Sequence, residues 1–377
     1  MKRLVLLGGG HAHVKVLADL AARRLEGWDV HLVSPYRRQI YSGMLPGWVA
    51  GHYAIESCAI ALDALAANAD ARFHQTAAVG LHLADSQVMC ADGTRLSFDR
   101  LSIDTGPLPA THELPGSAAH ALPIRPIETF VAAWPGLVDR MQSGQSVQDG
   151  QRGFNLAILG AGAAGVEVAL AVQHRAQTEG WQHVRITLVG SGAQPLEGAP
   201  DRARRQVARI LAQRGIAWLG GRRSVGVVAG RIDFDQGPPL NFDGCLVVTG
   251  AAAPAWPRAA GLATDERGFI RVQRTLQSVS HPQVFAVGDV AAYDDPRPKS
   301  GVYAVKAGPV LAENIRAACE GRPLRRWTPQ RRALYLISTG NCHALAIWGP
   351  WSVGGDWVWT WKDSIDRAFV RRFGTAA

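Results

Sequence analysis

The chain has 377 residues, 47% of them hydrophobic and 19% charged, so it can bury a sizeable core in about two domains. Its net charge of +9 lies in scattered arginine clusters with no nucleic-acid-binding motif beside them, and we expect no nucleic-acid partner. Five irregularly spaced cysteines predict neither a disulfide framework nor a metal site and fit the cytoplasm. No apolar stretch reaches the ~18 residues of a spanning helix, so any membrane contact should be peripheral.

The first 33 residues read as a βαβ unit. It comprises an apolar strand at 4–7, glycines at 8–10, an alanine-rich helix to about residue 24 and a second strand at 30–33. A glycine-rich turn between strand and helix lets backbone N–H groups and the positive helix end approach a diphosphate. His13 occupies the third glycine position of the usual fingerprint, and we expect it to hold the helix slightly away from the strand.

Three polar residues beside this turn, Ser34, His11 and His13, are not part of the usual dinucleotide-binding fingerprint. Ser34 stands where an acidic residue usually contacts ribose hydroxyls, about 20 residues after the turn. His11 and His13 flank the turn and are able to donate hydrogen bonds or carry protons. Because the sequence shows no carboxylate partner nearby, we favour a binding or packing role for both histidines over catalysis.

In the middle of the chain, a stretch of alternating polar and apolar residues is followed by a stretch rich in proline and glycine. Residues 72–104 predict strands and hairpins, with Asp92-Gly93 as a turn signal. Proline and glycine then punctuate residues 106–116, where we place a crossing between domains.

A second βαβ unit carries a complete fingerprint. An apolar strand at 156–159 leads into Gly160-x-Gly162-x-x-Gly165, followed by Glu167 on a helix to about 179 and a strand at 185–189. A turn that follows a strand and opens a helix is the context that a dinucleotide motif requires, so this unit predicts a second nucleotide site. Gly190 again replaces the ribose-binding acid, and nearby arginines leave NADPH open beside NADH; these arginines are Arg202, Arg204 and Arg205.

The last third of the chain combines a return crossing with an unusual tail. Strand-like residues 224–249 end in Val248-Thr249-Gly250, and residues 284–289 read as a buried strand that enters a turn. From about residue 326, tryptophans alternate with basic residues, a composition typical of segments that contact anionic lipid. Packing over the rest of the protein or at a dimer contact is an equally weighted alternative for this tail.

The order of these pieces resembles the pyridine nucleotide-disulfide oxidoreductase superfamily over roughly residues 1–320. Within it, the segments Gly8-Gly-Gly-His-Ala-His13, Tyr41-Ser-Gly-Met-Leu-Pro-Gly47 and Trp361-Lys-Asp-Ser-Ile-Asp-Arg367 resemble type II NADH dehydrogenase-like flavoproteins, which are sometimes fused to selenide, water dikinase. The resemblance implies an α/β fold with two Rossmann-like three-layer domains, the second inserted in the first. It further implies FAD on residues 1–110 and 250–325, NAD(P)H on 111–249, and a C-terminal segment at 326–377.

The resemblance also carries site residues onto this sequence. Lys306 is the candidate for a positive charge beside the flavin ring, with a surface role as an equal alternative. The residues implied for FAD are Gly8, Gly10, His11, Ser34, Arg38, Thr105, Gly106, Gly288, Asp289 and Val302. Those implied for NAD(P)H are Gly160, Gly162, Gly165, Glu167 and Gly250.

Departures from the relatives narrow the chemistry. Residues 41–50 lack the cysteine pair of disulfide reductases, and the second glycine motif lacks the reactive cysteine of sulfide:quinone oxidoreductases. Gly301-Val302 replaces the Ala-Gln pair that type II NADH dehydrogenases place near the flavin for quinone. We therefore predict hydride transfer from NAD(P)H to FAD with a quinone as the acceptor. A redox partner in sulfur or selenium metabolism and a non-catalytic nucleotide-sensing scaffold remain alternatives, as do a homodimer and a place on the cytoplasmic face of a membrane.

Overall fold

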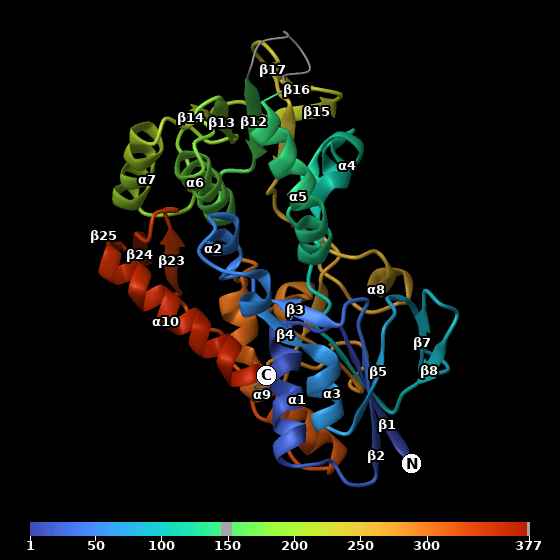
Figure 1. Ribbon diagram of the computed structural model, residues 1–377. Helices are drawn as coiled ribbons and strands as arrows, with labels where there is room; N and C mark the ends of the chain where they lie inside the picture. Colours follow the sequence, from blue (N-terminus) through green and yellow to red (C-terminus); the bar gives the residue numbers. More distant parts are fainter. Residues whose placement is uncertain (145–152, 375–377) are drawn as a thin grey trace.

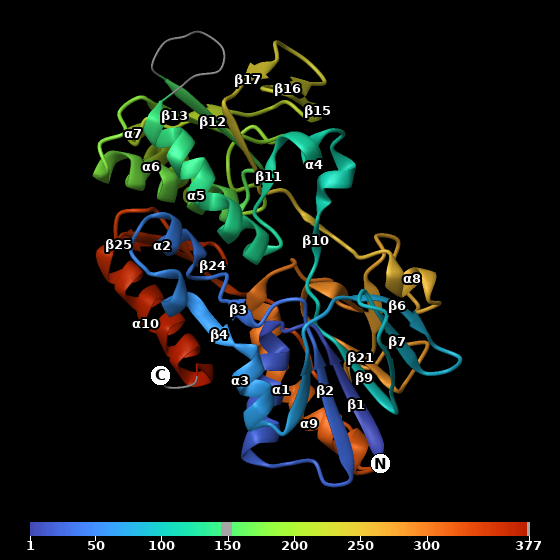
Figure 2. The same ribbon diagram turned by 45° about the vertical axis from the view of Figure 1, so that its right-hand side comes forward.

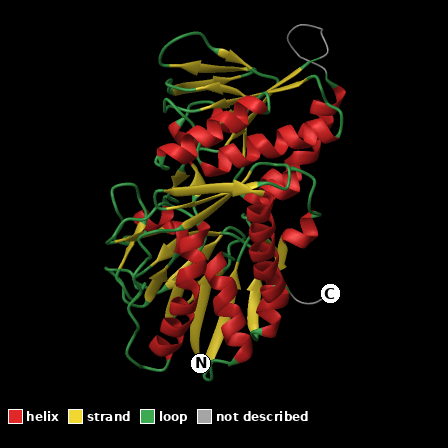
Figure 3. Cartoon of the chain, turned by 90° about the vertical axis from the view of Figure 1, so that its left-hand side faces the viewer, coloured by secondary structure: helices red, strands yellow, loops and turns green. Residues whose placement is uncertain are grey.

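Two α/β bodies and a C-terminal segment make up the computed structural model, which describes residues 1–144 and 153–374 (Figure 1). Residues 145–152 of the predicted nucleotide domain and the last three residues of the predicted C-terminal segment lie outside these ranges. The bodies lie one above the other, and the helical layer of the upper body faces the lower one (Figure 3).

The first body is built on a parallel sheet with strand order β21-β9-β1-β2-β5. Helices cover one face of this sheet and an antiparallel three-stranded unit covers the other (Figure 2). The strands are β1 (Lys2–Leu7), β2 (Trp28–Val33), β5 (Ala71–His74), β9 (Arg100–Ile103) and β21 (Val284–Ala286). The helices are α1 (His11–Ala22), α3 (Leu62–Asn68) and α9 (Gly301–Cys319), and the opposite unit is β6 (Ala78–His82), β7 (Gln87–Cys90) and β8 (Arg95–Ser97).

The second body repeats this plan on a parallel sheet with order β11-β18-β12-β13-β14. Its strands are β11 (Leu122–Pro123), β12 (Phe154–Leu159), β13 (Val184–Val189), β14 (Ala217–Leu219) and β18 (Gly244–Val247). Its helices are α5 (Ile127–Ser143), α6 (Ala163–Thr178) and α7 (Asp201–Gln213), and the opposite unit is β15 (Ser224–Val228), β16 (Arg231–Phe234) and β17 (Leu240–Asn241). The chain enters through β10 (Leu108–Pro109) and leaves through the antiparallel β19 (Ala251–Ala252), next to the predicted boundaries at 110 and 250.

Short elements complete the connections. The strand pairs are β3 (Arg38–Ile40) with β4 (Ala59–Ala61) and β20 (Ile270–Val272) with β22 (Ala291–Tyr293). The short helices are α2 (Leu45–Val49), α4 (Ser117–His120) and α8 (Trp256–Ala259), with 3₁₀ turns η1 (Ile55–Cys58), η2 (Ala110–Glu113) and η3 (Gly288–Val290).

Continuous apolar runs become the central strands because both faces of each sheet are covered. Residues 4–7 of β1 are fully buried, with even residues facing the helices and odd residues facing the β6–β8 unit. This two-sided burial explains why the sequence shows uninterrupted apolar runs here instead of alternation. The two βαβ units end within two residues of the bounds that the sequence predicts.

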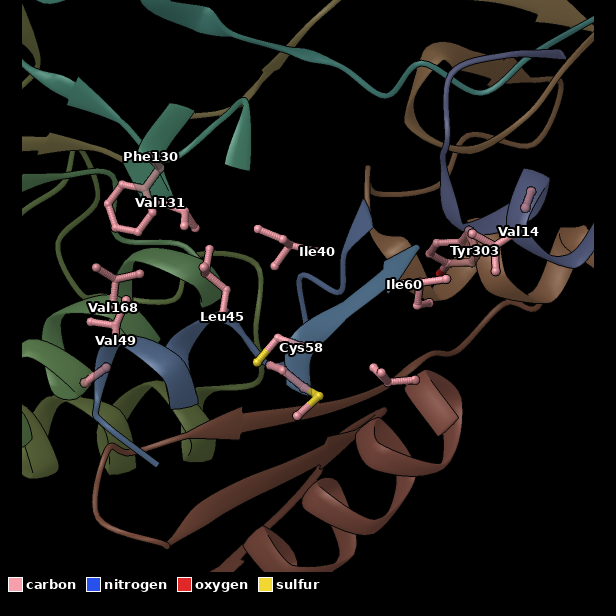
Figure 4. Close-up of a cluster of buried hydrophobic side chains, with 14 of the residues drawn as sticks. Val14, Ile40, Leu45, Val49, Cys58, Ile60, Phe130, Val131, Val168 and Tyr303 are labelled. Carbon is pink, nitrogen blue, oxygen red and sulfur yellow. The ribbon is translucent and has the colours of Figure 1, made fainter. Parts of the chain in front are cut away.

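Helix α2 joins the cores of the two bodies. Leu45 and Val49 lie beside Phe130 of α5 and Val168 of α6 in one buried apolar cluster (Figure 4). Trp48 adds an edge-on contact with Phe130 at 6.1 Å between ring centroids. Because apolar packing resists sliding, this cluster fixes the helical layer of the second body against the first.

The C-terminal segment is folded, although the sequence indicates only its composition. It forms an antiparallel sheet of β23 (Leu334–Ser338), β24 (Ala344–Trp348) and β25 (Trp351–Gly355), followed by α10 (Asp356–Phe373). In Figures 1 and 2, α10 runs along one side of the first body, below α7 of the second. No helix in the described part of the chain is both long and apolar enough to span a membrane.

Candidate functional site: two dinucleotide turns

The turn after β1 is closely packed and leaves backbone donors free. Gly8 has a φ of +89°, and a Cβ at this position would collide with the carbonyl of Asp104 at the end of β9. Gly10 caps α1 without a side-chain hydrogen bond, and a Cβ there would collide with the Asp104 carboxyl. Over residues 1–144 and 153–374, no protein acceptor bonds the backbone N–H groups of Gly9, Gly10 or His11. Three free N–H groups at a positive helix end suit a diphosphate.

Asp104 is a site residue that the sequence analysis missed. Its Oδ2 accepts hydrogen bonds from the backbone N–H groups of Ala12 (2.9 Å) and His13 (3.1 Å), at the first turn of α1. Burial raises the pKa of Asp104 to about 7, although both N–H groups oppose the rise. The signal was an acidic residue directly after a buried strand beside the first glycine turn.

His13 fills the space of the missing glycine. Its Nδ1 lies 2.7 Å from the carbonyl oxygen of Gly8, so Nδ1 donates and Nε2 accepts from the Ser102 hydroxyl at 2.8 Å. Burial lowers its pKa to about 4. Both ring nitrogens are thus used to hold the turn against β9, as a packing role requires.

His11 is buried with an unused donor. The Gln39 amide contacts His11 Nδ1 at 2.6 Å, which leaves the proton of the neutral ring on Nε2. Across the described chain, neither this Nε2 nor Gln39 Oε1 has a hydrogen-bond partner, although both are buried. Burial, with a contribution from the Arg125 charge, lowers the pKa of His11 to about 4. Buried polar atoms without partners indicate a ligand, since leaving them unpaired costs about 1–3 kcal/mol each.

A group of charges surrounds the turn after β21. Gly288 has a φ of +70°, and Asp289 is buried beside Arg125, with Oδ2 and Nη1 3.5 Å apart. Lys299 donates to the carbonyl of Ala291 at 2.6 Å, and burial lowers its pKa to about 8. Burial raises the pKa of Asp289, while Arg125 and Lys299 hold it down. The sequence analysis assigned Asp289 but did not identify Arg125 or Lys299.

The other residues predicted for FAD lie on several separate elements. Gly106 has a φ of +71° in the turn after Thr105, and Val302 is half-buried in the first turn of α9. Ser34 is buried and bonds within its own turn, donating to the carbonyl of Tyr36 at 3.0 Å. Arg38 forms a bidentate ion pair with Glu128 of α5, at 2.9 and 3.2 Å. Lys306 is exposed on α9.

The second turn has the form that its fingerprint predicts. Gly160 has a φ of +109° and packs against the backbone of Val248, and Gly165 packs against the carbonyl of Gly160. Gly162 caps α6 without a side-chain hydrogen bond and has open space around it. Gly250 is exposed near the carboxyl end of β18. The close packing at Gly160 and Gly165 admits no larger side chain, so the backbone of the turn is free to face a ligand.

Glu167 faces the C-terminal segment. Its Oε1 accepts a hydrogen bond from the backbone N–H of Ser338 in β23, at 2.9 Å. Burial raises the pKa of Glu167 to about 7, opposed by the charge of Lys362 on α10. The contact ties α6 to the C-terminal sheet, and a role for Glu167 toward NAD(P)H remains a prediction.

Helix α10 is clamped onto residues 41–53 of the first body. The buried Lys362 ammonium donates to the carbonyl of Gly43 and to Asp366, both at 2.6 Å. Phe369 stacks on Tyr41 at 4.6 Å and lies 5.8 Å from the ring of His11. The C-terminal segment therefore forms one wall beside the first glycine turn.

The residues present fit an FAD, with one departure. Free N–H groups at the turn, the unpaired Nε2 of His11 and the cations Arg125 and Lys299 are complementary to an anionic dinucleotide. Asp104 departs from this pattern, because its carboxylate competes for helix N–H groups that a diphosphate would use.

Comparisons with known proteins place the chain. The family described as pyridine nucleotide-disulphide oxidoreductase matches residues 2–308. The chain belongs to this family. It is 24% identical to the alternative NAD(P)H-ubiquinone oxidoreductase C1 of Arabidopsis thaliana, over 85% of this chain and 68% of that protein.

Solved structures share the fold at low identity. The NDH2 structure from Plasmodium falciparum, in complex with NADH, superimposes with a TM-score of 0.83 at 12% identity, covering 99% of this chain and 97% of that one. The sulfide:quinone oxidoreductase of Aquifex aeolicus gives 0.81 at 18% identity, covering 100% and 93%. The predicted family, the two-domain Rossmann-like fold and the class of FAD-dependent NAD(P)H oxidoreductases are thereby confirmed.

Proposed function

We propose that this chain oxidises NAD(P)H with FAD and passes the electrons to a quinone. FAD lies at the turn after β1, on residues 1–110 and 250–325, and NAD(P)H lies at the turn after β12, on 111–249. The observation that carries the proposal is the pair of glycine turns, each opening a long helix whose own N-cap residue makes no side-chain hydrogen bond, in bodies whose cores are joined through α2. The family match and the name of the Arabidopsis relative support the quinone as acceptor.

The chain's own residues have distinct roles in this proposal. Bound FAD supplies the hydride acceptor and the site of electron transfer. His11 donates a hydrogen bond from Nε2 toward the cofactor, and its neutral ring adds no charge at pH 7. Arg125 and Lys299 supply positive charge beside Asp289, which offers its carboxylate to ribityl hydroxyls.

A turnover assay tests the proposal. The purified full chain should carry about one FAD and oxidise NADH or NADPH faster when a soluble short-chain quinone is added. A chain that binds FAD but shows no acceleration with any quinone would point to another acceptor or to the scaffold alternative. A chain that binds no FAD would end the proposal.

The sulfide alternative is disfavoured by the state of the thiols. Burial raises the pKa of Cys58, Cys245 and Cys319 to about 12, and burial also raises the pKa of the exposed Cys342. A thiol attacks an electrophile such as a flavin only as the thiolate, and these thiols are mostly protonated at neutral pH. Sulfide is itself a nucleophile that attacks a disulfide, whereas all five cysteines lie in the described residues as free thiols. Flavin reduction by sulfide in the absence of NAD(P)H would reverse this ranking.

We propose further that the C-terminal segment docks on an anionic lipid surface. Trp357, Trp361 and Ile365 form an exposed stripe on α10 with spacing of four residues, and Trp351 is 69% exposed on the neighbouring hairpin. Exposed arginines lie on the same helix and on the neighbouring α7, and Arg202 lines a pocket with Trp351; these arginines are Arg202, Arg205 and Arg209 on α7 and Arg371 and Arg372 on α10. Large aromatic residues with flanking cations are typical of interfacial helices.

Changing the stripe should remove vesicle binding. A variant with Trp357→Ser, Trp361→Ser and Ile365→Ser is expected to bind anionic phosphatidylserine vesicles at least tenfold less than the parent protein, because the apolar contact is lost. The measurement is co-sedimentation at low and high salt, with the equally exposed Val79→Ser as a matched control. Unchanged sedimentation would contradict the proposal, and a change from dimer to monomer instead would assign the surface to self-association.

Nucleotide preference should be weak. Gly190 directly follows β13 and lacks the carboxylate that repels a 2′-phosphate, so kcat/KM for NADPH is expected to lie within about tenfold of that for NADH. Replacing Gly190 with aspartate would restore that charge, but Trp218 crowds this position. Steady-state kinetics with both donors is therefore the cleaner measurement. A discrimination of 1000-fold in either direction would show that another group reads the ribose.

A further inference from the structure

The first helix end already holds an anion. Asp104 Oδ2 accepts from Ala12 and His13, the second and third residues of α1, and its side chain is almost fully buried. These are N–H groups that a dinucleotide turn offers to a diphosphate. In this chain, therefore, an internal carboxylate and the cofactor compete for the same donors.

The surroundings give the carboxylate little room to leave. A Cβ at Gly10 would collide with the Asp104 carboxyl, and one at Gly288 would lie 2.8 Å from its Oδ1. Asp289 adds a second negative charge that acts on Asp104. An arriving diphosphate would thus meet two carboxylates in a confined space, an arrangement that disfavours the ionised form of a carboxyl.

We propose that Asp104 takes up one proton from solvent when FAD binds. Its carboxyl changes from an anion that caps α1 into a neutral acid that donates a hydrogen bond to the cofactor diphosphate. One O–H bond forms at the carboxyl and one bond to hydrogen breaks in the solvent donor, which is hydronium or a buffer acid; the proton returns to solvent when FAD leaves. The inference rests on the proposed function in one respect only, which is the placement of FAD at this turn.

The neighbours on α1 and β22 do not take this proton instead. Burial lowers the pKa values of His11 and His13 to about 4, so both rings stay neutral between pH 5.5 and 8. The hydroxyl of Tyr293 accepts from the backbone N–H of Gly288 at 3.1 Å, and burial raises its pKa. The pKa of Asp104, about 7 in the structure, places its ionisation within the measurable range.

One neighbouring cation titrates in the same range. Lys299, which acts on Asp289, has a pKa lowered to about 8 by burial, and its loss of charge would also weaken FAD binding above that pH. The contribution of Lys299 cancels when the Kd of the parent protein is divided by that of an Asp104 variant at each pH.

The test is the Kd of FAD for the full chain between pH 5.5 and 8, measured from the fluorescence of released FAD after dilution of the loaded protein. The parent Kd should be constant below about pH 7 and rise by up to about tenfold per pH unit above it, as uptake of one proton requires. Asp104→Asn should remove this rise, so that the ratio of the two Kd values grows about fivefold from pH 7 to 8, as one group with a pKa of about 7 requires. The exposed Asp70→Asn should keep the parent slope.

Each outcome decides the matter. A parent Kd independent of pH, or an Asp104→Asn protein that keeps the slope, would overturn the inference while leaving the proposed function intact. If Asp104→Asn fails to fold, calorimetric titration of the parent chain in two buffers with different ionisation enthalpies measures the proton directly; uptake approaching one proton above pH 7 supports the inference and none overturns it. FAD that binds at no pH would overturn the proposed function and this inference together.

Discussion

Replacing Gly162 with aspartate is expected to raise the KM for NAD(P)H by about 100-fold while leaving bound FAD in place. Gly162 caps α6 at a φ of −72°, and no atom lies within 4 Å of a Cβ built there, so the side chain fits without strain. Aspartate is a favourable helix cap, and the fold should therefore be kept. Its carboxylate would occupy the helix end and repel the nucleotide diphosphate, an effect of about 2.7 kcal/mol for a 100-fold change.

Asparagine at the same position is the matched control. Gly162→Asn has nearly the same size and caps the helix without a charge, so its KM should rise by about tenfold or less. Flavin content and the absorbance spectrum of both variants should match those of the parent protein. Equal KM values for Gly162→Asp and the parent would show that NAD(P)H does not bind at this turn.

Replacing Lys362 with methionine is expected to destabilise the C-terminal segment by about 3–5 kcal/mol. Lys362 and Asp366 form a buried ion pair at 2.6 Å, with side-chain exposures of 11% and 8%. Removing only the cation leaves the Asp366 carboxyl buried without its partner, which is the costly way to break such a pair. Limited proteolysis around residues 326–377 and the midpoint of urea unfolding measure the loss.

The pH dependence of stability distinguishes the loss of the Lys362–Asp366 ion pair from a loss of side-chain packing. Burial already raises the pKa of Asp366, and losing Lys362 raises it further. A carboxyl whose folded pKa lies above its unfolded value destabilises the fold as pH rises above the unfolded value, near 4. The defect of Lys362→Met should therefore shrink near pH 5, and a second change, Asp366→Leu, should recover at least half of it at pH 7. A defect independent of pH, with no recovery, would contradict this account.

The parts of the fold that the sequence predicts are those with local physical requirements. A strand, a glycine turn and an alanine-rich helix are recognisable together because close approach at Gly160 and Gly165 admits no side chain. The buried strands are recognisable in the sequence as continuous apolar runs. The β23–β25 sheet is not recognisable in this way, because its short strands acquire their pairing only from the chain that folds around them.

The site is less predictable because its residues act through neighbours distant in sequence. Asp104 bonds to Ala12 of α1, which is 92 residues away in the sequence, and Arg125 contacts Asp289, which is 164 residues away. The position of a lysine relative to α9 also matters. Lys306, on α9, has the charge that the resemblance implies, but its side chain is exposed. Lys299, which precedes α9, is partly buried, and its charge acts on Asp289. Which residues of a family motif face a ligand follows from such tertiary contacts and not from the motif alone.

Anaerobic single-turnover absorbance of the bound flavin tests the central claim most directly. Addition of NADH or NADPH to the purified full chain should bleach the flavin band, and a soluble quinone mixed in afterwards should restore it with one two-electron equivalent per flavin. Gly162→Asp should slow only the first step at a given nucleotide concentration. A flavin that stays oxidised with both nucleotides, or a reduced flavin that no quinone reoxidises, would contradict the account.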